Sequence, residues 1–135
     1  MTFPAGYDTD KGQDPAEDHI GPFYYRLLDG EYEFAFLAGP EHANSSNTLH
    51  GGVMMTFADY SLCMVATDGY ENESCVTVSF SSEFIASAEV GQVITCKAEV
   101  VRKTGSMVFV RGDVRAGEQI LLNFSSVVKR MQPRD

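Results

Sequence analysis

The spacing of hydrophobic and polar residues changes along the chain, and each change predicts a different kind of element. Across residues 18–28 apolar residues recur at helical spacing, which predicts a short helix that begins near Pro22. Asp29-Gly30 is a turn, and residues 31–37 then alternate in the manner of a half-buried strand. Residues 39–49 are mainly polar and predict a loop.

The next segment predicts a long, buried helix. The fourteen residues from Val53 to Ala66 contain one charge, Asp59, and their apolar positions go nearly all the way round a helix. A helix of this kind must be buried on most of its sides. It is preceded by Gly51-Gly52 and ends at Asp68-Gly69, where a glycine suits a left-handed cap.

The rest of the sequence has the pattern of strands. Segments rich in β-branched residues predict strands at 76–84, 93–102, 107–114 and 118–129. Short turns at Thr104-Gly105 and Ala116-Gly117 make the strands that they join antiparallel neighbours. The element order predicts an α+β domain with one sheet of about five strands. A single helix cannot cover such a sheet, so we expect a homodimer.

Length and composition limit the class of protein. A chain of 135 residues, 44% hydrophobic and 21% charged, is expected to form one globular domain. Residues 1–16 carry many acids and little to bury, so we expect a flexible acidic tail followed by one domain at 17–135. A net charge of −9 argues against a nucleic-acid partner. Without a membrane-spanning stretch or a signal pattern, we expect no membrane association and a cytoplasmic location.

The cysteines, His42 and three methionines are interpreted as packing or surface residues. Cys63, Cys75 and Cys96 lie far apart, with no C-x-x-C pair and no histidine at ligand spacing. They are therefore expected to be small core residues, and neither a metal site nor a disulfide is predicted. His42 is expected to be a solvated loop residue. The methionines Met54, Met55 and Met64 are expected in the core or at an interface.

The position of Asp59 calls for an explanation. A carboxylate in an apolar helix costs several kcal/mol unless it is paired, hydrogen-bonded or open to water. No lysine or arginine lies within a turn or two of it. Asp59 therefore points either to a solvent-lined gap or a distant cation, or it is a general base or nucleophile that lines a cleft.

His50-Gly51-Gly52 favours the second interpretation. The first N–H groups of a helix lack intrahelical partners, and two glycines let another group approach them, which makes a site for an oxyanion. Asp59 follows His50 by nine residues, about 13 Å along one helix. One chain cannot use both groups on one carbonyl, so the spacing predicts an active site shared between two subunits.

The run Asn44-Ser-Ser-Asn-Thr-Leu-His50-Gly-Gly-Val-Met-Met-Thr-Phe-Ala-Asp59 closely resembles the signature of the hotdog-fold thioesterase superfamily. Within it, the resemblance is to the phenylacetate-degradation (PaaI-like) branch and extends over roughly residues 20–130. It implies a curved antiparallel sheet of five or six strands wrapped around a long central helix. It also implies hydrolysis of acyl-CoA or aryl-acyl-CoA by a homodimer or a homotetramer, with CoA entering only as part of the substrate and no other cofactor. Relatives often have a proline at the position of Ser87.

The resemblance implies roles for particular residues. Asp59 would attack the thioester or activate water, and the Gly51 N–H of the other subunit would polarise the carbonyl. Asn44 would hold that carbonyl or the group that partners Asp59. His50 would shape the loop. Thr77 would supply a hydroxyl that positions water. Exposed cations at a predicted hairpin are candidates for binding the CoA phosphates, namely Arg102 and Lys103.

Two other functions remain open at this point. One is a hotdog-fold dehydratase or hydratase, in which a histidine acts as a base on a substrate carbon. The other is a hotdog protein that binds an acyl or aryl ligand without catalysis. The Ala-Asp position of Asp59 and the placing of His50 beside two glycines favour hydrolysis over both.

Overall fold

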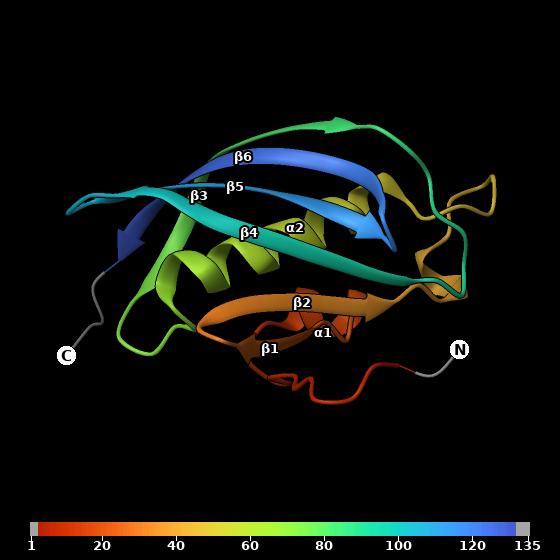
Figure 1. Cartoon of the computed structure of the whole chain (residues 1–135), viewed down its shortest axis with the longest axis horizontal. Helices are drawn as coiled ribbons and strands as arrows, with labels where there is room; N and C mark the ends of the chain where they lie inside the picture. The colour runs from red at the N-terminus through yellow and green to blue at the C-terminus, as the bar shows by residue number, and fades with distance from the viewer. Residues whose placement is uncertain (1–2, 132–135) are drawn as a thin grey trace.

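The long helix lies in the hollow of a curved, six-stranded antiparallel sheet (Figure 1). The computed structural model describes residues 3–131. The helices are α1 (Pro15–Ile20) and α2 (Gly51–Thr67), with a short 3₁₀ turn at Pro40–His42. The strands are β1 (Tyr24–Leu28), β2 (Glu31–Leu37), β3 (Ser74–Phe84), β4 (Val93–Lys103), β5 (Met107–Ala116) and β6 (Gln119–Met131). The predicted α+β class, the long helix and the four later strands are confirmed.

The strand order is β1-β2-β4-β5-β6-β3, so β1 and β3 form the two edges. The predicted hairpins join β4 to β5 and β5 to β6, and β3 lies beside β6. Three register shifts interrupt the ladders, one of them between Thr77 and Ser79. Because a β-bulge bends and twists a strand, these shifts favour the curvature that lets the sheet wrap around α2.

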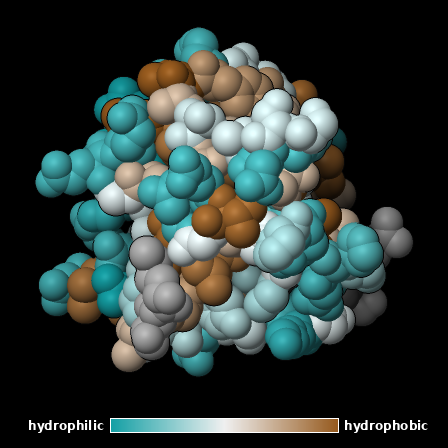
Figure 2. Space-filling model, turned by 90° about the vertical axis from the view of Figure 1, so that its right-hand side faces the viewer, coloured by the Kyte–Doolittle hydropathy of each residue, from teal (hydrophilic) through white to brown (hydrophobic). Residues whose placement is uncertain are grey.

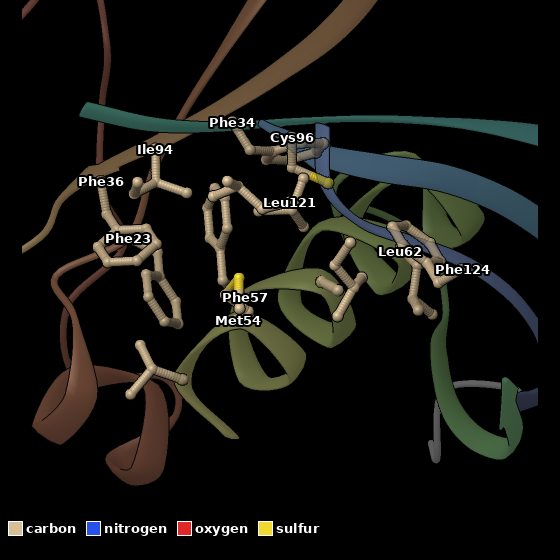
Figure 3. Close-up of a cluster of buried hydrophobic side chains, with 14 of the residues drawn as sticks. Phe23, Phe34, Phe36, Met54, Phe57, Leu62, Ile94, Cys96, Leu121 and Phe124 are labelled. Carbon is tan, nitrogen blue, oxygen red and sulfur yellow. The ribbon is translucent and has the colours of Figure 1, made fainter. Parts of the chain in front are cut away.

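The core lies between α2 and the concave face of the sheet (Figure 3). Phe34 and Phe36 of β2 and Phe57 and Leu62 of α2 are all completely buried. Burying one such side chain contributes about 1.5–3 kcal/mol. This layer fixes α2 against the sheet and thereby fixes the direction of the side chains on the opposite face of the helix.

The predicted helix across residues 18–28 is wrong. The chain there forms the last part of α1, crosses Gly21-Pro22, and continues as β1, which pairs with β2 in register from Tyr24↔Ala35 to Leu28↔Glu31. Asp29 and Gly30 both have positive φ, at 53° and 80°, as a two-residue hairpin turn requires. Pairing with β2 therefore outweighs the local apolar spacing.

The segment before α1 contacts the domain. The backbones of Asp8 and Tyr25 exchange two hydrogen bonds of 2.8 Å, and the Asp14 side chain caps α1. The expected boundary between residues 16 and 17 falls inside α1, and the flexibility of residues 1–16 stays a prediction. Across residues 3–131, no helix combines the length and the apolar character that spanning a bilayer requires.

Candidate active site

Asp59 lies on the one stripe of the first half of α2 that stays accessible. Val53, Met54, Phe57 and Ala58 are buried in the core. The residues spaced between them, namely Gly52, Met55, Thr56 and Asp59, are exposed or half-buried. Their spacing of three and four residues places them along a single face of the helix. The apolar helix therefore leaves its only carboxylate at an open face, next to β3.

The neighbouring strand supplies a hydrogen bond to this carboxylate. Thr77 Oγ1 donates to Asp59 Oδ1 at 2.6 Å, between side chains that are eighteen positions apart in the chain. The β-bulge that follows Thr77 shifts the alternation of β3, so that both Thr77 and Phe80 point towards the helix. The hydroxyl satisfies one carboxylate oxygen and fixes the orientation of the group.

Cys63 also lies beside Asp59, one helical turn further on. Its sulfur is 3.9 Å from Asp59 Oδ1 and 3.5 Å from Thr77 Oγ1. Cys63 is buried, as expected for a core residue, and its contact with the carboxylate was not predicted. The signal that could have revealed the contact is the spacing of four residues between Asp59 and Cys63.

The start of α2 leaves one backbone N–H unused. His50 is the N-cap, and its Nδ1 accepts a hydrogen bond from the Gly52 N–H at 2.8 Å. The N–H groups of Val53 and Met54 bond to the His50 carbonyl. The Gly51 N–H has no acceptor among residues 3–131. Of the two glycines, therefore, Gly51 is the one whose N–H can bind an oxyanion. His50 shapes the turn by accepting the Gly52 N–H.

An aromatic ring covers the bare face of Gly51. A Cβ placed on Gly51 would lie 2.9 Å from Cε1 of Phe84, at the end of β3. Phe84 is itself 53% exposed. Figure 2 views the end of the molecule that carries the loop from β2 to α2, and it shows apolar side chains near the centre of a largely hydrophilic face. The start of the helix thus offers an N–H beside an accessible aromatic ring.

Asn44 organises the loop before α2. Its Oδ1 accepts hydrogen bonds from the Ser46 N–H, the Thr48 N–H and the Thr48 hydroxyl at 3.0–3.2 Å. No hydrogen bond joins it to Asp59 within residues 3–131. In this chain the side-chain oxygen of Asn44 serves its own loop, and its role towards a substrate carbonyl stays a prediction.

The expectation of a solvated His42 is wrong. His42 is 2% exposed, its Nδ1 accepts from the Gly39 N–H at 2.9 Å, and its Nε2 bonds to the carbonyl of Ile20. Its carbonyl accepts the His50 N–H at 2.8 Å. Ile20 is 22 positions away in the sequence, so the local polar composition gave no sign of this partner. His42 therefore ties the end of α1 to the turn that starts α2.

The two candidate CoA-binding cations have different surroundings. Lys103 Nζ lies 2.7 Å from Glu73 and donates to the Ala66 carbonyl near the end of α2. Glu73 also pairs with Arg130 at 2.8 Å, and the pKa of Glu73 is lowered chiefly by its hydrogen bond from Lys103. Arg102 is exposed and has no ion pair within the described residues. Arg102 is thus the more available of the two.

A second carboxyl group, that of Glu17, lies near Asp59. Glu17 of α1 is half-buried, and its pKa is raised to about 7, first by burial and then by the charges of Asp14, Asp59 and Asp18. Within residues 3–131, no group of three or more potential ligands could hold a metal ion. Around Asp59 the chain itself supplies a carboxylate, the Thr77 hydroxyl and the Cys63 thiol.

One chain does not bring Asp59 and Gly51 together. They are eight residues apart on the same straight helix, which corresponds to about 12 Å along its axis. A carbonyl oxygen held by the Gly51 N–H is therefore out of reach of the carboxylate of the same α2.

The architecture and the matching sequence together identify the class of protein. A curved antiparallel sheet wrapped around one long helix is the hotdog fold. Residues 46–122, a span that includes His50, Gly51, Asp59 and Thr77, match the model of the Thioesterase superfamily. The chain belongs to this superfamily, as the resemblance of its sequence implied.

Individual relatives resemble the chain over almost its whole length. It is 28% identical over 129 residues to PA0474 of Pseudomonas aeruginosa, whose name proposes an esterase, with 94% of this chain and 96% of the relative covered. A mutant of the phenylacetic acid degradation protein PaaI from Thermus thermophilus has a TM-score of 0.75 at 20% identity, covering 87% of this chain and all of the other. BH2602 from Bacillus halodurans, solved with CoA, has a TM-score of 0.79 at 17% identity, covering 93% and 83%.

Proposed function

We propose that the protein hydrolyses acyl-CoA thioesters at a site formed by Asp59 of one subunit and Gly51 of another. The observation that supports this proposal is the state of two groups on α2. One is an accessible carboxylate held by the Thr77 hydroxyl, and the other is a helix-start N–H without an acceptor among the described residues. Membership of the Thioesterase superfamily supports a thioester as the bond that is cleaved.

The two groups have complementary tasks in this mechanism. The Gly51 N–H, aided by the positive end of the α2 dipole, stabilises the oxyanion that forms when the thioester carbonyl is attacked. Asp59 either activates a water molecule that attacks the carbonyl, or attacks the carbonyl itself to form a mixed anhydride that water then hydrolyses; in both routes the C–S bond breaks and CoA leaves as the thiol after taking up a proton. Thr77 holds the carboxylate in the orientation needed for either route.

The free edge of β3 supports a shared site. Strand β3 carries Thr77 and has no strand on its outer side within residues 3–131. Antiparallel pairing of two β3 edges would extend the sheet and run the two α2 helices in opposite directions, so that each Asp59 approaches the start of the other helix. The exposed residues Val101 and Phe109 on the outer face of the sheet support further association of dimers into a tetramer.

The CoA moiety is proposed to meet Arg102, because Lys103 is already paired with Glu73. Binding of CoA is also suggested by its presence in the related structure of BH2602. Exposed cations are the groups that attract phosphates, and their attraction must act against the net charge of −9.

Release of CoA from a panel of acyl-CoA and aryl-acyl-CoA thioesters tests the proposal. The Asp59→Asn variant keeps the size of the side chain and removes its charge, so kcat is expected to fall by about 10²-fold or more. Light scattering on both proteins serves as the control that the assembly is unchanged. Equal kcat values in the two proteins would contradict a catalytic Asp59, and binding without turnover by the unmodified chain would show a ligand-binding protein instead.

A further inference from the structure

Two cysteines lie in the same layer of the structure as Asp59 and Thr77. Cys63 follows Asp59 by one turn of α2, and Cys75 precedes Thr77 by two residues on the same face of β3. The helix and the strand therefore face one another through two successive pairs of side chains. The first pair is Asp59 and Thr77, with a hydrogen bond of 2.6 Å, and the second is Cys63 and Cys75.

The two cysteines are neighbours, and Cys63 also contacts the Thr77 hydroxyl. Cys63 and Cys75 lie close enough together for each thiol to shift the pKa of the other, and Tyr70, from the connection between α2 and β3, lies beside both of them. Cys63 Sγ also lies 3.5 Å from Thr77 Oγ1. The pair is thus directly connected to the hydroxyl that orients the carboxylate.

The environments of the two thiols give them different reactivities. The pKa of Cys75 is lowered, chiefly because the Cys63 thiol donates a hydrogen bond to its sulfur. The pKa of Cys63 is raised, first by the same hydrogen bond and then by burial. Cys75 is half-buried, whereas Cys63 is 7% exposed. Since the thiolate is the reactive form of cysteine, Cys75 is the group that meets an oxidant first.

We propose that Cys63 and Cys75 form an oxidisable dithiol that hydrogen peroxide converts reversibly into a disulfide between α2 and β3. The Cys75 thiolate attacks one peroxide oxygen, the O–O bond breaks, and the departing hydroxide takes up a proton to form water. The Cys63 sulfur then displaces hydroxide from the resulting sulfenic acid, losing its own proton, and a second water forms. Two thiols lose two electrons in total, and one peroxide gains them.

The disulfide is expected to weaken the active site, and this consequence rests on the proposed function. Forming the S–S bond draws the Cys63 sulfur towards β3 and removes its hydrogen from the neighbourhood of Thr77 Oγ1. The position of Thr77 relative to Asp59 changes as a result. We expect kcat for thioester hydrolysis to fall at least tenfold in the oxidised protein and to return after reduction with dithiothreitol.

Mass spectrometry of the full-length protein tests the disulfide without any reference to activity. After treatment with equimolar hydrogen peroxide, alkylation and digestion, the peptides that contain Cys63 and Cys75 are expected to be joined. Cys96 is the internal control, because it is 1% exposed and burial raises its pKa to about 12. It is expected to stay reduced. Two separate oxidised thiols, or a Cys75–Cys75 link between two chains, would overturn the proposal.

Two variants separate the possible outcomes. Cys96→Ser is expected to form the same disulfide as the unmodified protein, whereas Cys75→Ser is expected to leave Cys63 as a free thiol. A disulfide that forms in the unmodified protein while kcat stays constant would overturn the coupling to the site. If the reduced protein hydrolyses no thioester, the proposed function fails, and the mass measurement still decides whether the dithiol exists.

Discussion

Asp59 can occupy an otherwise apolar helix because its surroundings relieve the cost of its charge. One carboxylate oxygen accepts a hydrogen bond from the Thr77 hydroxyl at 2.6 Å, and the side chain remains partly exposed on the accessible stripe of α2. A carboxylate with a hydrogen bond and access to water avoids most of the penalty of burial. The same features leave the second oxygen available for chemistry.

Removing the Thr77 hydroxyl tests whether it acts through Asp59. In Thr77→Val the side chain keeps its shape and loses its donor, so we expect kcat to fall about 10-fold or more with little change in KM. Thr77→Ser keeps the hydroxyl and is expected to stay within a few-fold of the unmodified protein. Steady-state kinetics with one acyl-CoA checks both variants, and an unchanged kcat in Thr77→Val would exclude this role.

Residues whose chemistry depends on a short stretch of sequence were predicted best. Asp59 in an apolar helix and the glycines at its start are visible in a short stretch of sequence, and the structure places both as expected. The prediction for His42 was wrong and the one for Cys63 was incomplete, because His42 contacts Ile20 and Cys63 contacts Thr77, both distant in the sequence. Local spacing says nothing about partners that folding brings in from elsewhere.

At the scale of elements, the prediction succeeded where pattern and pairing agree. Strands β4 to β6 have alternating side chains and tight turns, and their observed bounds differ little from those expected. The prediction for residues 18–28 was wrong because Tyr24, Leu27 and Leu28 fit a helical stripe as well as an edge strand. Only the hairpin through Asp29-Gly30 decides between these alternatives, and its effect depends on the pairing with β2.

The ion pairs of Glu73 hold the end of α2 against the sheet. Its carboxylate bonds to Lys103 and Arg130, and Lys103 also bonds to the Ala66 carbonyl. The folded state lowers the pKa of Glu73, so this stabilisation is present above the pKa of the unfolded carboxyl and is lost as the pH falls through the folded pKa.

The Glu73→Gln variant is therefore expected to be less stable at pH 7 by about 1 kcal/mol. The difference from the unmodified protein should disappear at a pH below the lowered pKa of Glu73. Thermal unfolding followed by circular dichroism at several pH values measures both effects. Glu99→Gln removes the exposed pair with Arg111 and is the matched control, with little expected change. A loss of stability in Glu73→Gln that does not depend on pH would contradict the electrostatic explanation.

At the scale of the whole molecule, the β3 edge of the sheet is the feature that most clearly suggests a partner. This strand runs from Ser74 to Phe84, carries Val76 and Val78 with about half of their surface exposed, and has one side unpaired within residues 3–131. A long, apolar edge strand is a template for pairing with another chain. The prediction of a dimer follows from this edge as well as from the separation of Gly51 and Asp59 on one helix.

The start of α2 allows the shared site to be dissected cleanly. Gly51 is the first helical residue, where a proline is tolerated, and His50 already has the extended conformation (φ −64°, ψ 133°) that a following proline requires. Gly51→Pro thus removes the N–H, while Gly51→Ala keeps it. Both variants bring the same new Cβ against the flexible Phe84 ring, so Gly51→Ala controls for that Cβ, while proline also replaces the N–H with its ring carbons.

The most direct measurement is the hydrolysis rate of a purified heterodimer with Asp59→Asn in one subunit and Gly51→Pro in the other. Each variant alone is expected to form an inactive homodimer. The heterodimer has one intact site, with Asp59 from one chain and Gly51 from the other, and should recover about half of the unmodified rate. A heterodimer as inactive as the two homodimers, while an Asp59→Asn and Gly51→Ala heterodimer remains active, would contradict a site shared between subunits.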